Sequence, residues 1–299
     1  MISFDTPTVI IVVGPTAVGK TAAAIRLAQK LDTQIISADS RQCYRELDIG
    51  VAKPTPQELE AVPHYFINSH SITEEVNAAM FEELALQWTA EIFQRSSVAV
   101  MVGGTGLYIR AFTSGLDAIP PVDQTIRAHI RDHYEEHGLA WLQSEVQKYD
   151  PEYYSKGEML NPQRLMRALE VRMSTGQSIL SFQNREPRER PFQIRIIGLN
   201  LPREQLNQRI HARVDEMMKA GLLAEAERLL PYRHHNALQT VGYKELFHYF
   251  DEGGKETLEQ AVTAIKTNTR QYAKRQLTWF HRDLSIRWTD PGTPLETLL

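Results

Sequence analysis

The segment Gly14–Thr21, GPTAVGKT, limits the possible folds of this chain more than any other stretch, because it fits the pattern G-x-x-x-x-G-K-S/T in full. It follows Thr8–Val13 (TVIIVV), a β-branched run of strand length, and it leads into Thr21–Leu31, which has a helical pattern. Between a strand and a helix, such a loop turns its backbone N–H groups toward an anion, and Lys20 adds a full positive charge. The pattern therefore predicts a phosphate-binding loop in an α/β protein.

Two further stretches continue the alternation of strands and helices. QIISAD ends in Asp39, and Ser97–Val102 (SVAVMV) leads into Gly103–Gly106 (GGTG), with a helical stretch at Ala78–Arg95 between them. Apolar strands separated by helices are typical of a parallel sheet. Ligands of such sheets bind beyond the carboxyl ends of the strands. We therefore expect the phosphate-binding loop, Asp39 and GGTG at one edge of the sheet.

The pattern changes between Pro120 and Arg190, where helical signals run without a convincing strand. Pro120–Pro121 opens this block, REPRERP closes it as a solvated linker, and Gln193–Leu201 resumes the strand pattern. The predicted fold class is α/β: a P-loop parallel sheet core of the adenylate-kinase-like type with an all-helical insertion domain and a helical C-terminal region. The predicted bounds are 1–119 and 191–299 for the core and 120–190 for the insertion.

Composition excludes several classes of protein. The chain has 299 residues and a single cysteine, Cys43, so internal disulfides and cysteine-based zinc or iron–sulfur sites are excluded, and Cys43 is expected to be a packing residue. No apolar run reaches the length of a membrane span, and the start of the chain lacks a signal-peptide pattern, so we expect a cytoplasmic protein with no membrane partner. The net charge is −4, so a nucleic acid would need a local basic surface.

Most P-loop enzymes that hydrolyse nucleotides need an acidic residue at the end of an apolar strand. This chain lacks one at the usual position. VAVMV ends in GGTGLYIR, and the first acid after it is Asp117. Asp39 is the acid at a strand end, where it would steady Mg²⁺ or act as a general base. The loop is therefore predicted to bind a di- or triphosphate, and departure of a diphosphate becomes an alternative to phosphoryl transfer.

The segment Leu258–Asp283 combines basic and aromatic residues. Lys266, Arg270 and Lys274 are spaced by four and share a helix face, with aromatic residues such as Tyr272 interleaved. Cations for backbone phosphates and flat rings for exposed bases suit RNA. A solvated basic face with its aromatics in the core fits the segment equally well, so both interpretations stay open on this segment alone.

Seven motifs occur in one order along the chain. After GPTAVGKT come ISADSRQCYRELDIGVAKP, VGGTGLYIRAF, NPQRLMRALEV, RVDEMMKAGLLAEAERLL, TVGYKE and IKTNTRQYAKRQLTWF. Together they resemble the bacterial tRNA dimethylallyltransferases, also called tRNA isopentenyltransferases, over nearly the whole chain. The resemblance implies transfer of a dimethylallyl group from dimethylallyl diphosphate to N6 of the adenosine 3′-adjacent to the anticodon, with release of diphosphate. It implies Mg²⁺ as cofactor and the anticodon stem-loop of tRNAs reading codons that begin with U as partner, with the target base flipped out. We expect a monomer.

The resemblance also assigns residues. It implies that Asp39 is the general base and that Thr105 hydrogen-bonds near the reacting amine, with Thr21 on the metal. The expected contacts to the diphosphate or a nucleotide are Gly14, Pro15, Thr16, Ala17, Val18, Gly19, Lys20, Thr21 and Arg213. The expected contacts to tRNA are Asp39, Ser40, Arg41, Gln42, Thr105, Arg127, Gln163, Arg164, Leu165, Met166, Arg167, Gln239, Thr240, Val241, Gly242, Tyr243, Lys244, Lys274, Arg275, Gln276, Leu277, Thr278, Trp279, Phe280 and His281.

Three other functions fit part of the pattern. A nucleotide or small-molecule kinase shares the loop and the α/β core, but it would not need the basic, aromatic C-terminal helix. A prenyltransferase acting on free AMP or ADP would not need the insertion. A non-catalytic RNA-binding P-loop protein would tolerate replacement of Asp39.

Overall fold

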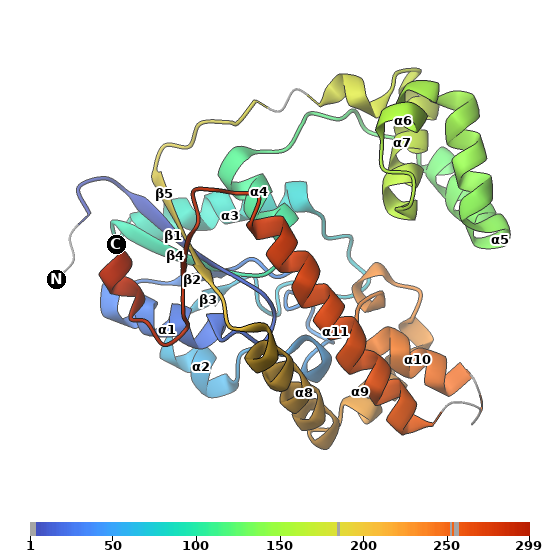
Figure 1. Ribbon diagram of the computed structural model, residues 1–299. Helices are drawn as coiled ribbons and strands as arrows, with labels where there is room; N and C mark the ends of the chain where they lie inside the picture. Colours follow the sequence, from blue (N-terminus) through green and yellow to red (C-terminus); the bar gives the residue numbers. More distant parts are fainter. Residues whose placement is uncertain (1–3, 184–185, 252, 254–256) are drawn as a thin grey trace. The chain divides into compact units, whose positions relative to one another are not determined.

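The computed structural model describes residues 4–183, 186–251, 253 and 257–299 (Figure 1). The chain divides into two compact units, one formed by Met1–Ser114 with Glu189–Leu299 and the other by Gly115–Arg188. Arg185, at the start of the REPRERP segment, lies outside the described residues.

The first unit is built on a parallel sheet of six strands in the order β3-β2-β4-β1-β5-β6. In the centre of the sheet, Val12 pairs with Val102 on one side and with Ile197 on the other. Both faces of this centre are covered, which is why its strands are continuous apolar runs and not alternating patterns. The strands are β1 (Thr8–Val13), β2 (Ile35–Ser37), β3 (His64–Tyr65), β4 (Val98–Val102), β5 (Gln193–Leu199) and β6 (Arg287–Thr289).

The helices of the first unit pack on the faces of this sheet or gather at one end of it. The helices are α1 (Lys20–Leu31), α2 (Pro56–Ala61), α3 (Ala78–Phe93), α4 (Gly106–Ser114), α8 (Arg203–Lys219), α9 (Leu222–Leu229), α10 (Tyr243–Asp251) and α11 (Leu258–Phe280). Short 3₁₀ turns cover Ile49–Val51, Leu230–Tyr232, Asn236–Leu238 and Leu295–Leu298. Helices α8 to α11 lie together beyond the carboxyl end of β5 (Figure 1).

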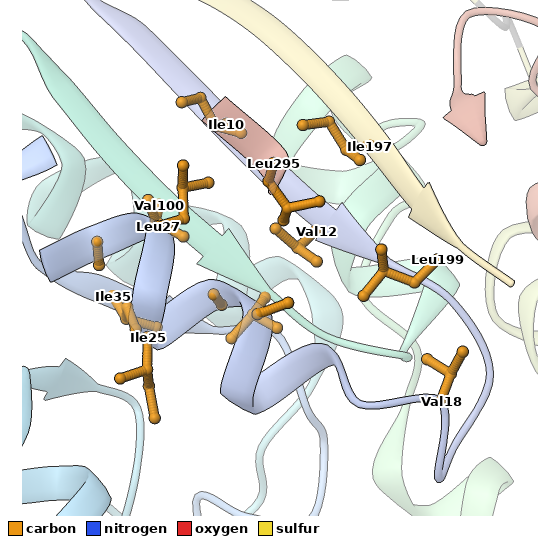
Figure 2. Packing of buried hydrophobic residues seen from close by; sticks show 14 of the residues in the cluster. Ile10, Val12, Val18, Ile25, Leu27, Ile35, Val100, Ile197, Leu199 and Leu295 are labelled. Atoms are coloured by element: carbon orange, nitrogen blue, oxygen red, sulfur yellow. The ribbon is translucent and has the colours of Figure 1, made fainter. Parts of the chain in front are cut away.

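The core of the first unit lies between α1 and the sheet. Ile10, Val12, Val100 and Ile197 from the three central strands pack with Leu27 of α1, all at most 1% exposed (Figure 2). Burial of each such side chain contributes roughly 1.5–3 kcal/mol. This core fixes the direction in which β1 delivers the loop that follows it.

The second unit has its own small core and, in its described residues, no strand. It contains α5 (Gln124–Tyr149), α6 (Pro151–Lys156), α7 (Pro162–Thr175) and a 3₁₀ turn at Ile179–Phe182. Gly138 interrupts α5 with a φ of 73°, which divides this long helix into two helical stretches. Ile130, Leu142 and Leu165 are fully buried between these helices.

The C-terminal region contains a strand that the sequence did not suggest. We predicted a helical region, but β6 pairs in parallel with β5, with Thr289 opposite Leu199. The equally short β3 pairs with β2 at the other edge of the sheet. Two or three half-buried residues carry too little periodicity to be recognised as a strand.

REPRERP is not wholly the solvated linker that we expected. The Arg190 guanidinium is 9% exposed and lies 2.7 Å from the Glu82 carboxylate of α3. It also donates hydrogen bonds to the carbonyl oxygens of Phe112 (2.7 Å) and Ala111 (2.8 Å) at the end of α4. This segment is therefore anchored in the first unit by a buried ion pair.

Cys43 is fully buried, as expected of a packing residue, and burial raises the pKa of its thiol to about 12.

Within the described part of the chain, no helix combines the length and the apolar character that crossing a bilayer requires.

Candidate diphosphate and catalytic site

The loop Gly14–Thr21 joins β1 to α1 in a conformation that requires glycine at two positions. Gly14 has a φ of +145° and Gly19 a φ of +105°. A Cβ on Gly14 would lie 2.5 Å from the carbonyl oxygen of Leu199, so the loop passes closer to β5 than any side chain permits. Because α1 begins at Lys20, the loop presents the N-terminus of a helix, which favours a bound anion.

A cleft of about 410 Å³ opens against this loop at the carboxyl edge of the sheet. Its walls include Lys20 and Thr21 of the loop, Asp39 beyond β2, Arg213 of α8 and Tyr272 of α11. Six of the nine residues predicted to bind diphosphate thus meet the predicted general base in one cavity, whereas Gly14, Pro15 and Val18 are buried and do not line it. Strand β4 lies between β1 and β2, so the cleft spans the ends of three neighbouring strands.

Lys20 is held inside this cleft by its own loop. Its Nζ donates a hydrogen bond to the carbonyl oxygen of Pro15 at 2.7 Å. The pKa of Lys20 is lowered to about 7, chiefly by burial and in part by the nearby Arg213, while Asp39 opposes the shift. A bound anion would restore the favourable environment for the charged amine.

Binding of inorganic diphosphate is therefore expected to weaken as the pH rises above about 7. Below this pH Lys20 is already charged in the free protein, so this amine adds no pH dependence of its own. Above it, binding takes up a proton at Lys20, and that contribution raises the dissociation constant by up to about tenfold per pH unit. Calorimetric titrations in two buffers of different ionisation enthalpy measure affinity and proton uptake together. Lys20→Met is expected to remove the dependence, and a wild-type affinity that stays constant to about pH 9 would contradict the role of this amine.

Two arginines of α8 reach the loop from one helix face. Arg213 donates from Nη1 to Thr16 Oγ1 at 3.4 Å, and Arg209 donates from Nη1 to the carbonyl oxygen of Val18 at 3.1 Å. Burial lowers the pKa of Arg213, with Asp39 acting in the opposite sense. We did not predict Arg209, although its spacing of four from Arg213 was a usable signal.

Gln276 of α11 supports the loop from inside the protein. Its Oε1 accepts a hydrogen bond from the Thr16 N–H at 2.8 Å, and its Nε2 donates to the carbonyl oxygen of Gly104 at 2.9 Å. We had predicted that Gln276 contacts tRNA, but its side chain is only 6% exposed. Both ends of its amide are used to join the loop to GGTG. Tyr272, one turn earlier on α11, was named only as a possible stacking ring, yet it lines the cleft.

Asp39 and Thr105 lie in one small hydrogen-bonded group. Asp39 Oδ1 accepts hydrogen bonds from the backbone N–H groups of Arg41 (2.8 Å) and Gln42 (3.3 Å). Thr105 Oγ1 accepts from the Ser40 N–H at 3.1 Å. The two predicted catalytic residues are thus connected through adjacent residues of the turn after β2, and one oxygen of the carboxylate is already oriented by the backbone.

A second cavity of about 110 Å³ adjoins the cleft. The residues that line both are Thr16, Asp39, Val51, Ala52, Arg213 and Tyr272. The remaining wall is mostly apolar and includes Ile210, Val214, Met217, Leu222, Val241 and Ile265. A phosphate-binding end and an apolar end therefore meet at Asp39.

We did not predict a histidine in this cleft, but His64 of β3 lines it. Its Nδ1 lies 2.7 Å from the carbonyl oxygen of Val62, which makes Nδ1 the protonated nitrogen. Its Nε2 is buried and, among the described residues, has no hydrogen-bond partner. Burial lowers the pKa of His64, which favours the neutral ring with Nε2 as an acceptor.

The side chains of five predicted tRNA contacts lie in the interior. The five are Leu165, Met166, Tyr243, Gln276 and Phe280, each 9% exposed or less. Leu165 and Met166 occupy the apolar face of α7, and the Tyr243 hydroxyl donates to buried Glu225 at 2.6 Å. We therefore correct these five assignments: burial excludes side-chain contact with tRNA in this conformation.

Other predicted tRNA contacts remain available at the surface. On the first unit the exposed ones are Gln239, Lys244, Lys274, Arg275, Thr278 and His281. On the second unit Gln163 and Arg164 are exposed, while Arg127 and Arg167 contact Glu170 at 3.5 and 3.4 Å. The basic face of α11 is also partly neutralised, because Lys266 pairs with Asp215 at 2.6 Å.

A family model and named relatives from other organisms match most of this chain. Residues 42–283 match the family model described as IPP transferase. The chain is 46% identical to the tRNA dimethylallyltransferase of Cytophaga hutchinsonii, over 97% of this chain and 95% of that protein. It is 49% identical to the tRNA dimethylallyltransferase of Christiangramia forsetii, over 93% of this chain and 91% of that protein.

Solved structures agree. The tRNA isopentenylpyrophosphate transferase of Bacillus halodurans aligns with a TM-score of 0.69 and 36% identity, covering 95% of this chain and 90% of that one. A eukaryotic dimethylallyltransferase acting on tRNA aligns with a TM-score of 0.74 and 28% identity, covering 96% of this chain and 74% of that one. The length of the family match and the identity to these relatives lead to one conclusion: the chain belongs to the IPP transferase family.

Proposed function

We propose that this enzyme is a tRNA dimethylallyltransferase, which moves the dimethylallyl group of dimethylallyl diphosphate to N6 of the adenosine 3′-adjacent to the anticodon. The observation that carries the proposal is the junction at Asp39 between a cleft lined by the phosphate-binding loop and an apolar cavity. A prenyl diphosphate has one highly charged end and one apolar end, and this pair of cavities offers both. A kinase would have no use for the apolar end.

The charged end of the site favours departure of diphosphate. When the allylic C–O bond breaks, negative charge grows on the diphosphate oxygens, near Lys20, Arg213 and the loop N–H groups. Fixed positive groups of this kind stabilise a transition state because they need no reorganisation during the reaction. The new C–N bond forms as inorganic diphosphate leaves, so no water molecule is needed, which explains why the usual strand-end acid is dispensable.

The proton of the amine goes to Asp39. As N6 of adenosine bonds to the prenyl carbon, the amine must lose one proton, and Asp39 accepts it as general base. Thr105, joined to Asp39 through Ser40, orients the same amine. The apolar wall around the prenyl group excludes water, which would otherwise capture the developing positive charge on carbon.

Mg²⁺ fits the oxygen-rich part of the cleft. Thr21, Asp39 and Glu58 line the same cavity, and their oxygen atoms are the ligands that Mg²⁺ prefers. Among the described residues there is no cluster of three or more acidic, histidine or cysteine side chains that could hold a metal by itself. We propose that Thr21 holds the ion together with diphosphate and water, and that the bound ion neutralises charge on the leaving group.

We propose that the partner is the anticodon stem-loop of tRNAs that read codons beginning with U. An adenine stacked in the loop of a tRNA cannot reach Asp39, so the base must leave the stack. The exposed residues of α11, the segment 239–244 and the second unit would supply the contacts to the RNA. The cytoplasmic location and the monomeric state that we expect from the sequence stay part of this proposal.

Reversal of two exposed charges on α11 is expected to weaken tRNA binding without affecting the diphosphate. Lys274→Glu with Arg275→Glu should raise the dissociation constant for tRNA roughly 10- to 100-fold and lower the salt slope by about two, because two phosphate contacts are lost. Filter binding at several salt concentrations measures both quantities. Arg26→Glu with Lys30→Glu on α1 is the charge-matched control. Unchanged tRNA affinity in the α11 variant would mean that this helix does not contact the RNA.

The deciding experiment incubates an unmodified tRNA transcript that reads a codon beginning with U with the protein, Mg²⁺ and dimethylallyl diphosphate, without ATP. Nucleoside mass spectrometry is expected to find an adenosine heavier by one C₅H₈ unit. Product on free AMP but not on tRNA would make the chain a prenyltransferase of another substrate class. ATP-dependent phosphorylation of a small acceptor, with no prenylated product, would make it a kinase.

A further inference from the structure

The turn Ile49–Ala52 is a shared wall of the two cavities. Val51 and Ala52 line both of them, and Gly50 lines the apolar one. Ala52 has a φ of +49°, in the left-handed region that residues other than glycine rarely adopt. Such a conformation persists only where the surroundings hold it. The wall next to the reacting groups is therefore kept in place by contacts outside the turn itself.

Gln42 holds the carbonyl side of this turn. Its Nε2 donates hydrogen bonds to the carbonyl oxygens of Val51 (3.2 Å) and Ala52 (3.0 Å). Its own backbone N–H donates to Asp39 Oδ1 at 3.3 Å. Gln42 therefore joins the turn to the general base, and its side-chain amide, which we had predicted to contact tRNA, is used inside the protein.

Glu225 of α9 holds the amide side of the same turn. Its Oε2 accepts from the Ile49 N–H at 2.9 Å, and its Oε1 accepts from the Gly50 N–H at 2.9 Å and from the Tyr243 hydroxyl at 2.6 Å. Three donors thus converge on one carboxylate that is 4% exposed. The fit is tight, because a Cβ on Gly50 would lie 2.5 Å from the Tyr243 ring.

We propose that Glu225 is a positioning residue for prenyl transfer. It contacts no reacting atom, and it acts through the turn Ile49–Ala52 and Gln42 on the placement of Asp39 and on the wall between the cavities. A carboxylate suits this place because it accepts hydrogen bonds only, whereas an amide would turn an N–H₂ group toward at least one of the donors. The proposal rests on the proposed function, because the reaction being positioned is the prenylation of tRNA.

The test separates positioning from stability. Glu225→Ala is expected to lower kcat roughly 10- to 100-fold at saturating substrates, as small displacements of catalytic groups do. KM for dimethylallyl diphosphate should change by less than about threefold, because the loop and Lys20 still hold the diphosphate. Glu227→Ala, an exposed position on the same helix, is the matched control with wild-type kcat. Glu225→Gln keeps one oxygen acceptor, so its kcat should also fall, but by a smaller factor. This variant serves as the test if the alanine variant fails to fold.

A double-mutant cycle with Gln42→Ala identifies the route. If both residues act through one turn, the kcat of the double variant should lie within about twofold of that of the more impaired single variant. If the decreases in kcat of the two single variants multiply in the double variant, the residues act independently and the proposal is overturned. A Glu225 variant with a lowered melting temperature but wild-type kcat would overturn it too, since the role would be structural only. A wild-type protein that makes no prenylated tRNA in the same assay would instead overturn the proposed function, and the positioning role with it.

Discussion

Asp39→Asn is expected to lower kcat by about 10²- to 10⁴-fold, the range that a positioned general base contributes. The asparagine has the same shape as the aspartate, and its Oδ1 can still accept the hydrogen bonds from the N–H groups of Arg41 and Gln42. The turn after β2 should therefore keep its conformation while the proton acceptor is lost. KM for dimethylallyl diphosphate should change little, because Lys20 and the loop N–H groups remain.

Single-turnover formation of prenylated adenosine in tRNA is the measurement, since it reports the chemical step. Asp32→Asn is the matched control: it makes the same chemical change at an exposed position at the end of α1, where the residue has a φ of 49° that asparagine tolerates. A rate for Asp39→Asn within about tenfold of wild type would show that Asp39 is not the base, and would direct attention to His64, which also lines the cleft.

Arg190→Met should lower the free energy of unfolding by about 3–5 kcal/mol, because removal of one partner of a buried ion pair costs the attraction that offsets the desolvation of the other. The Glu82 carboxylate, 9% exposed, would lose its cation at 2.7 Å, and the carbonyl oxygens of Phe112 and Ala111 would lose their donors. Urea denaturation followed by circular dichroism measures the change.

The double variant Glu82→Leu with Arg190→Met provides the decisive comparison. Replacement of both charges by apolar side chains removes the buried carboxylate together with the guanidinium, so the double variant should be more stable than Arg190→Met alone. Arg203→Met, at an exposed position on α8, should unfold within about 0.5 kcal/mol of wild type. Equal stability of Arg190→Met and Arg203→Met would mean that the ion pair does not anchor the segment.

Local patterns predicted the centre of the fold but not its edges. β1 and β4 are apolar runs because they are covered on both faces, and both were recognisable for that reason. β5 is buried only in its last three residues, and it was recognisable from its β-branched residues. β3 and β6 have two and three residues, and only their pairing with β2 and β5 makes them strands. The burial of Arg190 could not be predicted from local sequence either. Its sequence neighbours are charged, so only the packing of α3 and α4 around it reveals that it is buried.

The site shows a similar division. The loop motif specifies backbone conformation, so the positions of Gly14, Gly19 and Lys20 followed from the sequence. The inward orientation of Gln276 did not, because which face of α11 meets the loop depends on how that helix packs on α8. Glu225 carried no chemical signal at all. A glutamate on a helix is usually a solvated residue, and its role depends on a turn about 175 residues earlier in the chain.

The hydrogen bond between Thr16 and Gln276 spans 260 residues, and this has a consequence for the order of events during synthesis. The first four strands are translated before residue 103, so the part of the sheet that carries the loop can begin to pair early, as amino-terminal segments do. The loop lacks its support, however, until the last long helix has emerged from the ribosome. A nascent or prematurely terminated chain therefore carries GPTAVGKT without a pocket that can hold diphosphate. Recognition of the motif in a fragment of such a protein identifies an ancestry and not a binding site.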